Sequence, residues 1–172
     1  MVDDLAAKIR TYRRSGVLVD TNLLLVYFVG LYDTATGYQL INTFKYTKGT
    51  YTAGDFDILL AFLQSFRTVV TTPHILAEVS NSLSGALIDP ARDLCLGLLQ
   101  QTIRSFQEHH VPAEELIRED RFRTYGITDM GIRRAQTRLQ GLTLVVRKWT
   151  HENRLFHEHR INCRLPSRLR MH

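Results

Sequence analysis

Apolar and polar positions follow one another along the chain in blocks that predict short strands separated by helices. Val17–Val19 form an uninterrupted apolar run, which ends at the polar triplet Asp20-Thr21-Asn22 and is followed by the apolar stretch Leu23–Val29. A short apolar run with a polar end is typical of a buried strand, and the stretch after it of a helix. Asp20 therefore stands at the carboxyl end of the first predicted strand, where ligands bind in open α/β sheets.

Strand and helix signals alternate over the rest of the chain. Asp55 is expected to cap the helix Phe56–Phe66, and Thr72 and Pro73 to begin the next helix. Further helices are expected at 3–14, from 89 to about 107, at 113–123, from 126 and around 152–160, and strands at 68–71, 142–146 and 161–162. This alternation favours an α/β fold in which helices cover both faces of a parallel sheet.

The range 30–54 has the weakest pattern in what is expected to be a single domain spanning 1–172. It contains four glycines and several Thr and Tyr residues, which indicate an insertion that forms a loop or flap. Lys45 and Lys48 lie among aromatic residues there, a mixture that can stack bases and hold phosphates. An ordinary packed surface insertion has the same composition, so the pattern leaves both interpretations open.

Composition places the chain among globular proteins, with 44% hydrophobic and 23% charged residues. No apolar run reaches the roughly 20 residues that a membrane span needs, and the acidic N-terminus lacks the layout of a signal peptide. Cys95 and Cys163 are far apart and form no C-x-x-C pair. We expect reduced thiols in a cytoplasmic protein that does not enter a membrane.

The net charge of +5 is unevenly distributed. Residues 1–132 hold 12 Lys/Arg against 15 Asp/Glu, a net charge of −3, whereas residues 133–172 hold 10 against 2, a net charge of +8. A basic end on a chain with an acidic centre suits a polyanion such as a nucleic acid. A solvated, arginine-rich helix and tail would give the same distribution.

Two further acids stand where plain surface charge is not expected. Glu78 borders the apolar stripe of its helix, next to Val79, and Asp129 lies in the first turn of the helix that Gly126 precedes. Each has an ordinary explanation, since Glu78 can be an edge residue and a carboxylate is favoured at a helix N-terminus. Together with Asp20, however, the three acids predict a joint site.

The chemistry of such a site follows from the residue types. Carboxylates at close range raise one another's pKa and stay ionised only beside a cation. Hard oxygen ligands select Mg²⁺ or Mn²⁺ rather than zinc. Such ions can activate water and stabilise the charge on a phosphodiester during its hydrolysis. The residues therefore indicate metal-dependent phosphoryl chemistry.

The chain resembles the PIN-domain nucleases over nearly its whole length. The resemblance rests on the segments 17–22, 71–81 and 126–129, each beside the expected strand end or helix start. It implies a three-layer α/β/α sandwich with a central parallel sheet and a Mg²⁺- or Mn²⁺-dependent endoribonuclease. It places Asp20, Glu78 and Asp129 at the catalytic, metal-binding positions, with Thr21 and Asn22 as polar support.

One departure concerns the fourth acid that such nucleases commonly carry in a Thr-x-Asp-like motif. The nearest match is Thr150-His151-Glu152, so Glu152 is a candidate metal ligand, although it also fits an ordinary solvated helix position. The arginines of the C-terminal region, such as Arg133, Arg134 and Arg147, are candidates for contacts with the RNA backbone.

Three functions follow from these residues and this resemblance. The first is an endoribonuclease, and small single-domain members are often the toxin of a toxin–antitoxin pair (VapC-like), usually a homodimer neutralised by an antitoxin protein. The second is a PIN-fold module that binds RNA or protein with weak or no catalysis, because the fourth acid is in doubt. The third is a phosphatase of the haloacid-dehalogenase type, which needs a second Asp where Asn22 stands.

Overall fold

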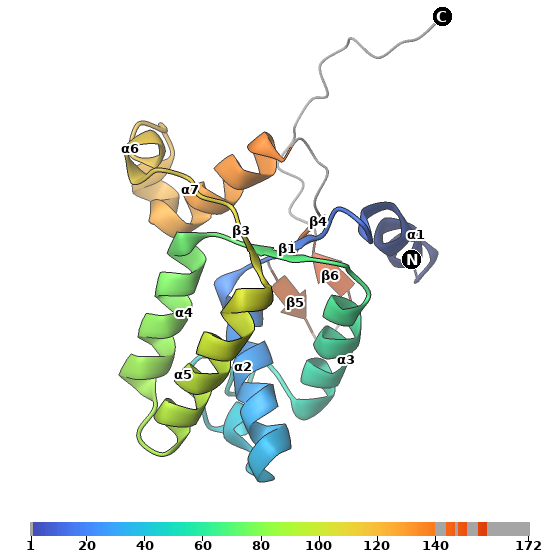
Figure 1. Ribbon diagram of the computed structural model, residues 1–172, viewed down its shortest axis with the longest axis vertical. Coiled ribbons are helices and arrows are strands. Elements are labelled where there is room, and N and C mark those ends of the chain that lie inside the picture. The colour runs from blue at the N-terminus through green and yellow to red at the C-terminus, as the bar shows by residue number, and fades with distance from the viewer. Residues whose placement is uncertain (1, 140–143, 147, 151–154, 158–172) are drawn as a thin grey trace, which may run out of the picture.

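The computed structural model describes residues 2–139, 144–146, 148–150 and 155–157. Four strands form one parallel sheet in the order β3-β2-β1-β4. Their bounds are β1 (Val17–Val19), β2 (Val69–Thr71), β3 (Gln107–Glu108) and β4 (Leu144–Val146). Val17 pairs with Val69 on one side and with Leu144 on the other, so β1 is an inner strand (Figure 1). The predicted parallel sheet is confirmed.

Seven α-helices and two 3₁₀ helices surround this sheet within the described residues. They are α1 (Val2–Tyr12), α2 (Thr21–Thr36), η1 (Leu40–Asn42), α3 (Ala53–Gln64), α4 (Pro73–Ala86), α5 (Ala91–Thr102), η2 (Ile103–Ser105), α6 (Ala113–Leu116) and α7 (Phe122–Arg138). In the view of Figure 1, α2 to α5 lie below the strands, and α6 and α7 lie above them. This mostly helical α/β arrangement is compatible with an α/β/α sandwich.

Helix α2 directly follows β1 and lies at the centre of the core. Leu23–Val26 are at most 1% exposed, and Phe28 and Val29 are 0% exposed, so α2 is buried on nearly every side. It packs against α3, α4 and α5. A helix that is apolar all round is stable only in such surroundings, and its burial fixes the position of Asp20 immediately before it.

The predicted loop at 30–54 is wrong for its first seven residues, because α2 continues to Thr36 and ends at Gly37, whose φ is +71°. Gly30 does not break the helix. A Cβ atom there would lie 2.1 Å from the Phe56 ring, so the glycine permits a close approach of α3. Sequence composition cannot distinguish these two uses of glycine.

The remainder of the range 30–54 packs onto the core. Ile41, Phe44, Thr47 and Tyr51 are at most 6% exposed. The carboxylate of Asp33 accepts hydrogen bonds from the backbone N–H groups of residues 40 and 41, at 2.6 and 3.0 Å. This part of the range is therefore packed, whereas Tyr46 remains 40% exposed, with Lys45 Nζ 5.3 Å from the centre of its ring.

The helix starts on either side of β2 agree only in part with prediction. Thr52, rather than Asp55, is the N-cap of α3, and Asp55 is the third residue of a capping box, where its carboxylate accepts from the Thr52 N–H at 2.8 Å. Thr72 caps α4 and Pro73 follows it, as predicted. The Thr72 cap fixes the start of α4, the helix that carries Glu78.

The expected elements are wrong at three places that no local signal marks. Helix α5 ends at Thr102, and the chain continues through η2 into β3, a strand too short to show alternation. The expected helix at 113–123 is interrupted between α6 and α7. The expected helix at 152–160 is wrong over β6 (Leu155–His157), which pairs antiparallel with β5 (Lys148–Thr150). The expected strand at 161–162 lies outside the described residues.

Candidate functional site

Asp20 lies where β1 ends and α2 begins. Its backbone is extended, with φ −73° and ψ 160°, and it is the N-cap of α2. Its Oδ1 accepts a hydrogen bond from the Thr21 N–H at 2.7 Å. The residue is only 9% exposed. The predicted place of this carboxylate, at the carboxyl ends of the strands and beside a helix N-terminus, is confirmed.

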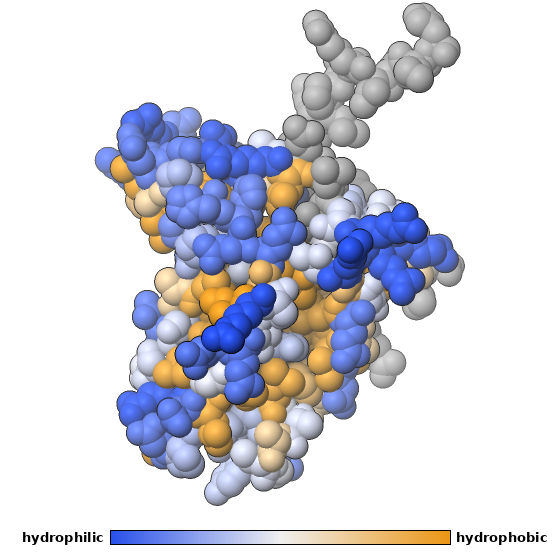
Figure 2. All heavy atoms as spheres, in the orientation of Figure 1, coloured by the Kyte–Doolittle hydropathy of each residue, from blue (hydrophilic) through white to orange (hydrophobic). Residues whose placement is uncertain are grey.

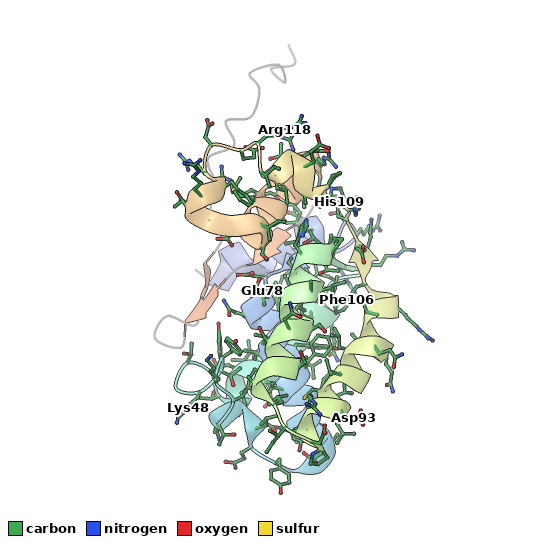
Figure 3. All side chains as sticks on the ribbon, turned by 90° about the vertical axis from the view of Figure 1, so that its left-hand side faces the viewer. Lys48, Glu78, Asp93, Phe106, His109 and Arg118 are labelled. Carbon is green, nitrogen blue, oxygen red and sulfur yellow. The ribbon has the colours of Figure 1, made fainter. Side chains whose placement is uncertain are left out.

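Thr21 links Asp20 to the second acid. Its hydroxyl donates a hydrogen bond to Oε2 of Glu78 at 2.9 Å, while its N–H donates to Asp20. Thr21 is 5% exposed, so this hydroxyl is held in a buried environment. Glu78 lies on α4 and projects from the side of that helix that faces away from α5 (Figure 3). One threonine thus brings together two carboxylates from elements that are distant in sequence.

Glu78 reaches this place because of the way α4 is packed. Thr72 accepts from the Ile75 N–H at 3.3 Å and starts the helix immediately after β2. The predicted core face of α4 is confirmed, since its four residues are all buried: Ile75, Leu76, Val79 and Leu83. Glu78 stands at the edge of that face, and its side chain is exposed. Burial of the neighbouring stripe therefore determines which way Glu78 points.

Asp129 stands in a helix start, as predicted. Gly126 has φ +73° and ψ −176°, so α7 is interrupted there and Asp129 falls in the first turn of its second segment. This segment packs beside the start of α4, where a Cβ atom on Gly131 would lie 3.1 Å from Cδ2 of His74. Asp129 is half-buried. The structure thus puts the third acid on a helix that contacts the one carrying Glu78.

The structure describes three of the four predicted metal ligands. Over the described residues, no three His, Cys, Asp or Glu side chains come close enough together to hold a metal ion. Asp20 and Glu78 form a pair of acids that both accept hydrogen bonds from Thr21. Glu152 lies outside the described residues, as does Arg147. Asn22 is exposed, and its place directly after Thr21 puts it at the rim of the pair.

The two remaining arginine candidates differ in their surroundings. Arg134 forms ion pairs with Glu115 at 3.5 Å and with Glu119 at 3.6 Å. Arg133 is half-buried and has no ion pair within the described part of the chain. It lies four residues after Asp129, on the same face of α7. Arg133 is thus available to an anion near the acids, whereas Arg134 joins α7 to α6 and the loop after it.

Sequence reasoning missed His109, which follows the two-residue strand β3. Its N–H donates to the Thr71 carbonyl at 2.8 Å, so it lies at the same edge of the sheet as Asp20. Burial first, and then the charges of Arg138 and His110, lower the pKa of His109 below its ordinary value. Its Nε2 and the Thr71 hydroxyl are buried without a hydrogen-bond partner among the described residues. A strand of two residues leaves no periodic signal that could have located it.

A compact set of charges holds α6 and α7 together beside this edge. Both carboxylate oxygens of Glu115 accept from Nη2 of Arg138, at 2.6 and 2.5 Å. The hydrogen bond from Arg138 is the main cause that lowers the pKa of the Glu115 carboxyl, and Arg134 contributes to it. His74 lies close by, with its Nε2 3.0 Å from the Val111 carbonyl. These contacts fix the position of the helix that carries Asp129.

Comparisons of the chain with protein-family models, with curated proteins and with solved structures found no match. Among the described helices, none combines the length and the apolar character needed to cross a bilayer. The site offers two carboxylates that share one threonine, at the carboxyl edge of a parallel sheet, with a third carboxylate on an adjoining helix.

Proposed function

We propose that the protein is a metal-dependent endoribonuclease. It hydrolyses RNA phosphodiester bonds beside Asp20 and Glu78, at the carboxyl ends of the parallel strands. The observation that carries the proposal is the pair of hydrogen bonds from Thr21, at 2.7 Å to Asp20 and 2.9 Å to Glu78. Two acids held by one buried residue, outside the carboxyl end of a parallel strand, form a defined ligand site. The resemblance to PIN-domain nucleases supplies RNA as the substrate class.

The donor set fits a hard divalent cation. Mg²⁺ is usually held by one or two carboxylates, and water and substrate phosphates complete its octahedron. Asp20 and Glu78 would hold it, with Asp129 and Glu152 as further candidate ligands. When bound, Mg²⁺ or Mn²⁺ supplies electrostatic stabilisation of the phosphodiester during attack by water.

The other residues of the site have roles that follow from their positions. Thr21 is a positioning residue, because it fixes both carboxylates while its hydroxyl and N–H are occupied. The start of the second segment of α7 directs backbone N–H groups towards the region of Asp129, which favours a negatively charged ligand. Arg133, one helical turn later, is placed to contact a phosphate of the strand. Arg147 is proposed to contact RNA because of its place in the basic C-terminal region. Asn22 is proposed to support the acids because it follows Asp20 and Thr21 in the sequence.

The test is cleavage of a mixed, fluorescently labelled RNA by the full chain in Mn²⁺ and in EDTA. We expect the wild type to cleave RNA in Mn²⁺ but not in EDTA. The Asp20→Asn and Glu78→Gln variants should not cleave RNA in either condition. Asp89→Asn is the matched control, because Asp89 is an exposed carboxylate that pairs with Arg92 at 2.6 Å, at the start of α5. Equal cleavage by the wild type and Asp20→Asn would show that the activity comes from elsewhere.

A second candidate is a module that binds RNA or a protein without cutting. The observation that favours it is that the described residues bring together a pair of acids rather than a group of three. RNA binding without cleavage in Mn²⁺, unaffected by Asp20→Asn, would select this function. A role as the cytoplasmic toxin of a toxin–antitoxin pair, as a homodimer with an antitoxin partner, is proposed from the resemblance. Growth arrest on expression, abolished by Asp20→Asn, would test that role.

A further inference from the structure

Four exposed arginines gather at the opposite edge of the sheet from the acids. Arg10 lies in the last turn of α1, Arg13 and Arg14 lie in the turn before β1, and Arg67 lies just before β2. Because β1 and β2 are parallel, the segments that precede them meet at the amino edge of the sheet. We call these four residues the arginine patch. Figure 2 shows a cluster of strongly hydrophilic residues over α1.

The backbone holds the segments of Arg13 and Arg67 side by side. The N–H of Arg67 donates to the carbonyl of Arg13 at 2.8 Å, and the N–H of Val17 donates to the carbonyl of Thr68 at 3.0 Å. The two segments approach so closely that a Cβ atom on Gly16 would lie 2.8 Å from the Thr68 oxygen. The juxtaposition is therefore built into the start of two core strands and does not depend on side-chain rotamers.

The patch is not neutralised within the described residues. None of its four guanidinium groups takes part in an ion pair there, whereas Arg92, Arg118 and Arg138 are each paired with a carboxylate. Like charges held close together repel one another. An anion that spans several of them relieves this repulsion, and guanidinium groups bind phosphate in bidentate geometry.

A purely structural role explains only part of the arrangement. A cation in the last turn of a helix interacts favourably with the helix dipole, which accounts for Arg10. It does not account for Arg67, which comes from a different part of the chain and lies beyond the end of α3. Convergence of arginines from separate elements is typical of a surface that binds a polyanion.

The surroundings of the patch favour a nucleic acid over a membrane surface. A helix that lies on a membrane exposes apolar side chains next to its basic ones. In α1, Ile9 and Tyr12 instead pack against the protein core. Among the side chains whose burial the structure describes, the exposed large apolar ones lie on other elements: Tyr38, Tyr46, Ile58, Ile88, Leu94, Ile117, Tyr125 and Ile127. Phosphates without lipid tails are the ligand that this surface suits.

We propose that the arginine patch is a second RNA-binding surface, which holds the sugar–phosphate backbone of the strand at a distance from the acids. The choice of RNA rests on the proposed function. Between the two surfaces lie the three residues of β1, which rise by about 10 Å in total. One RNA strand that contacts both surfaces is held at two points, so binding at the patch raises the effective concentration of RNA at the acids.

The experiment measures fluorescence anisotropy of a labelled single-stranded RNA with the full chain in EDTA, at several salt concentrations. Arg13→Gln/Arg14→Gln/Arg67→Gln is compared with Arg92→Gln/Arg104→Gln/Arg118→Gln, which removes the same charge elsewhere on the surface. For single strands, the slope of log K against log [salt] becomes shallower by about 0.7 for each phosphate contact that is lost. We therefore expect the slope of the patch variant to be shallower by about 2, and that of the control variant to be unchanged. The affinity ratio of wild type to patch variant then shrinks roughly 20-fold between about 50 and 200 mM salt.

A second set of variants keeps the test decisive if the triple variant does not fold, as judged by its thermal unfolding. Arg14→Gln alone should lower the slope by about 0.7, and Arg13→Lys/Arg14→Lys/Arg67→Lys should retain the wild-type slope. Unchanged slopes in the Arg→Gln variants of the patch, equal losses in the control triple, or no RNA binding by the wild type would each overturn the proposal. So would patch-dependent binding to phosphatidylglycerol vesicles without RNA binding. If RNA binding depends on the patch but the wild type does not cleave RNA in Mn²⁺, the proposed nuclease function is contradicted and the RNA-binding surface is supported.

Discussion

Thr21 and Glu78 are separated by 57 positions in the chain, yet the hydroxyl of the first donates a hydrogen bond to Oε2 of the second at 2.9 Å. The same threonine donates its N–H to Asp20. Two acids that the sequence marks only as misplaced charges therefore share one buried residue. The geometry of the proposed site depends on a side chain that carries no charge.

Replacement of Thr21 by Val should impair activity more than stability. The variant keeps the shape of the side chain and removes the donor to Glu78, whose exposed carboxylate can turn to water instead. We expect kcat to fall about 10- to 100-fold with little change in KM, as for residues that orient ligands, and a stability loss of about 1 kcal/mol. Thr21→Ser, which keeps the hydroxyl, is the control and should retain most of the activity.

Arg133 and Arg134 should separate in function although they are neighbours. Arg134→Ala removes partly exposed ion pairs to Glu115 and Glu119 and should lower the free energy of unfolding by at most about 1 kcal/mol. Arg133→Ala should leave stability unchanged and weaken RNA binding, since its side chain has no ion pair in the described region. Urea unfolding and RNA anisotropy on both variants check the pair. Weaker binding by Arg134→Ala alone would reverse the assignment.

Gly16→Ala should destabilise the protein through the backbone. Gly16 has φ +111°, and the added Cβ would lie 2.8 Å from the Thr68 carbonyl oxygen. A strained conformation of this kind costs about 1–3 kcal/mol. Gly37→Ala provides the comparison, because its φ of +71° is also left-handed but no atom of the described residues lies within 4 Å of its Cβ position. Urea unfolding should show a larger loss for Gly16→Ala than for Gly37→Ala.

The link between Glu115 and Arg138 should make stability depend on pH. Hydrogen bonding to Arg138 lowers the folded-state pKa of Glu115 below its ordinary value of 4.5. Its contribution is therefore present above the unfolded-state pKa and is lost as the pH falls through the folded-state pKa. We expect the stability difference between wild type and Glu115→Gln to be constant from pH 7 to about 5 and to shrink below about pH 4.5. A difference that grows on acidification would contradict this.

Cys95 should resist thiol reagents in the folded protein. It is 0% exposed, and burial, together with the nearby charge of Asp33, raises the pKa of its thiol to about 12. Because the thiolate is the reactive species, a Cys163→Ser variant should show no reaction with Ellman's reagent until urea unfolds it. Rapid labelling under native conditions would show that the core around α5 opens readily.

The parts of the fold that the sequence predicted well are those with a strong local signal. The apolar run at β1 and the Thr72-Pro73 start of α4 are such cases. Helix α2 was predicted too short because Gly30 serves a close contact with Phe56, which only the tertiary structure shows. Strand β3 was missed because two residues have no period.

The candidate site followed the same division. Asp20 and the helix start at Asp129 were placed correctly from the strand and helix signals beside them. The hydrogen bond between Thr21 and Glu78 depends on how α4 packs against the start of α2, and no local pattern encodes that register. The ion pairs of Arg134 could not be predicted from local sequence either, because Glu115 and Glu119 come from another segment of the chain.

The strand order has a consequence for the moment at which the site becomes complete during synthesis. β1 pairs with β2 on one side and with β4, more than a hundred residues later in the chain, on the other. Because domains are made from the N-terminus onwards, Asp20 and Glu78 leave the ribosome long before Leu144–Val146 do. Until then β1 has no partner strand on that side, so the proposed nuclease should gain its final geometry only after Leu144–Val146 have been translated.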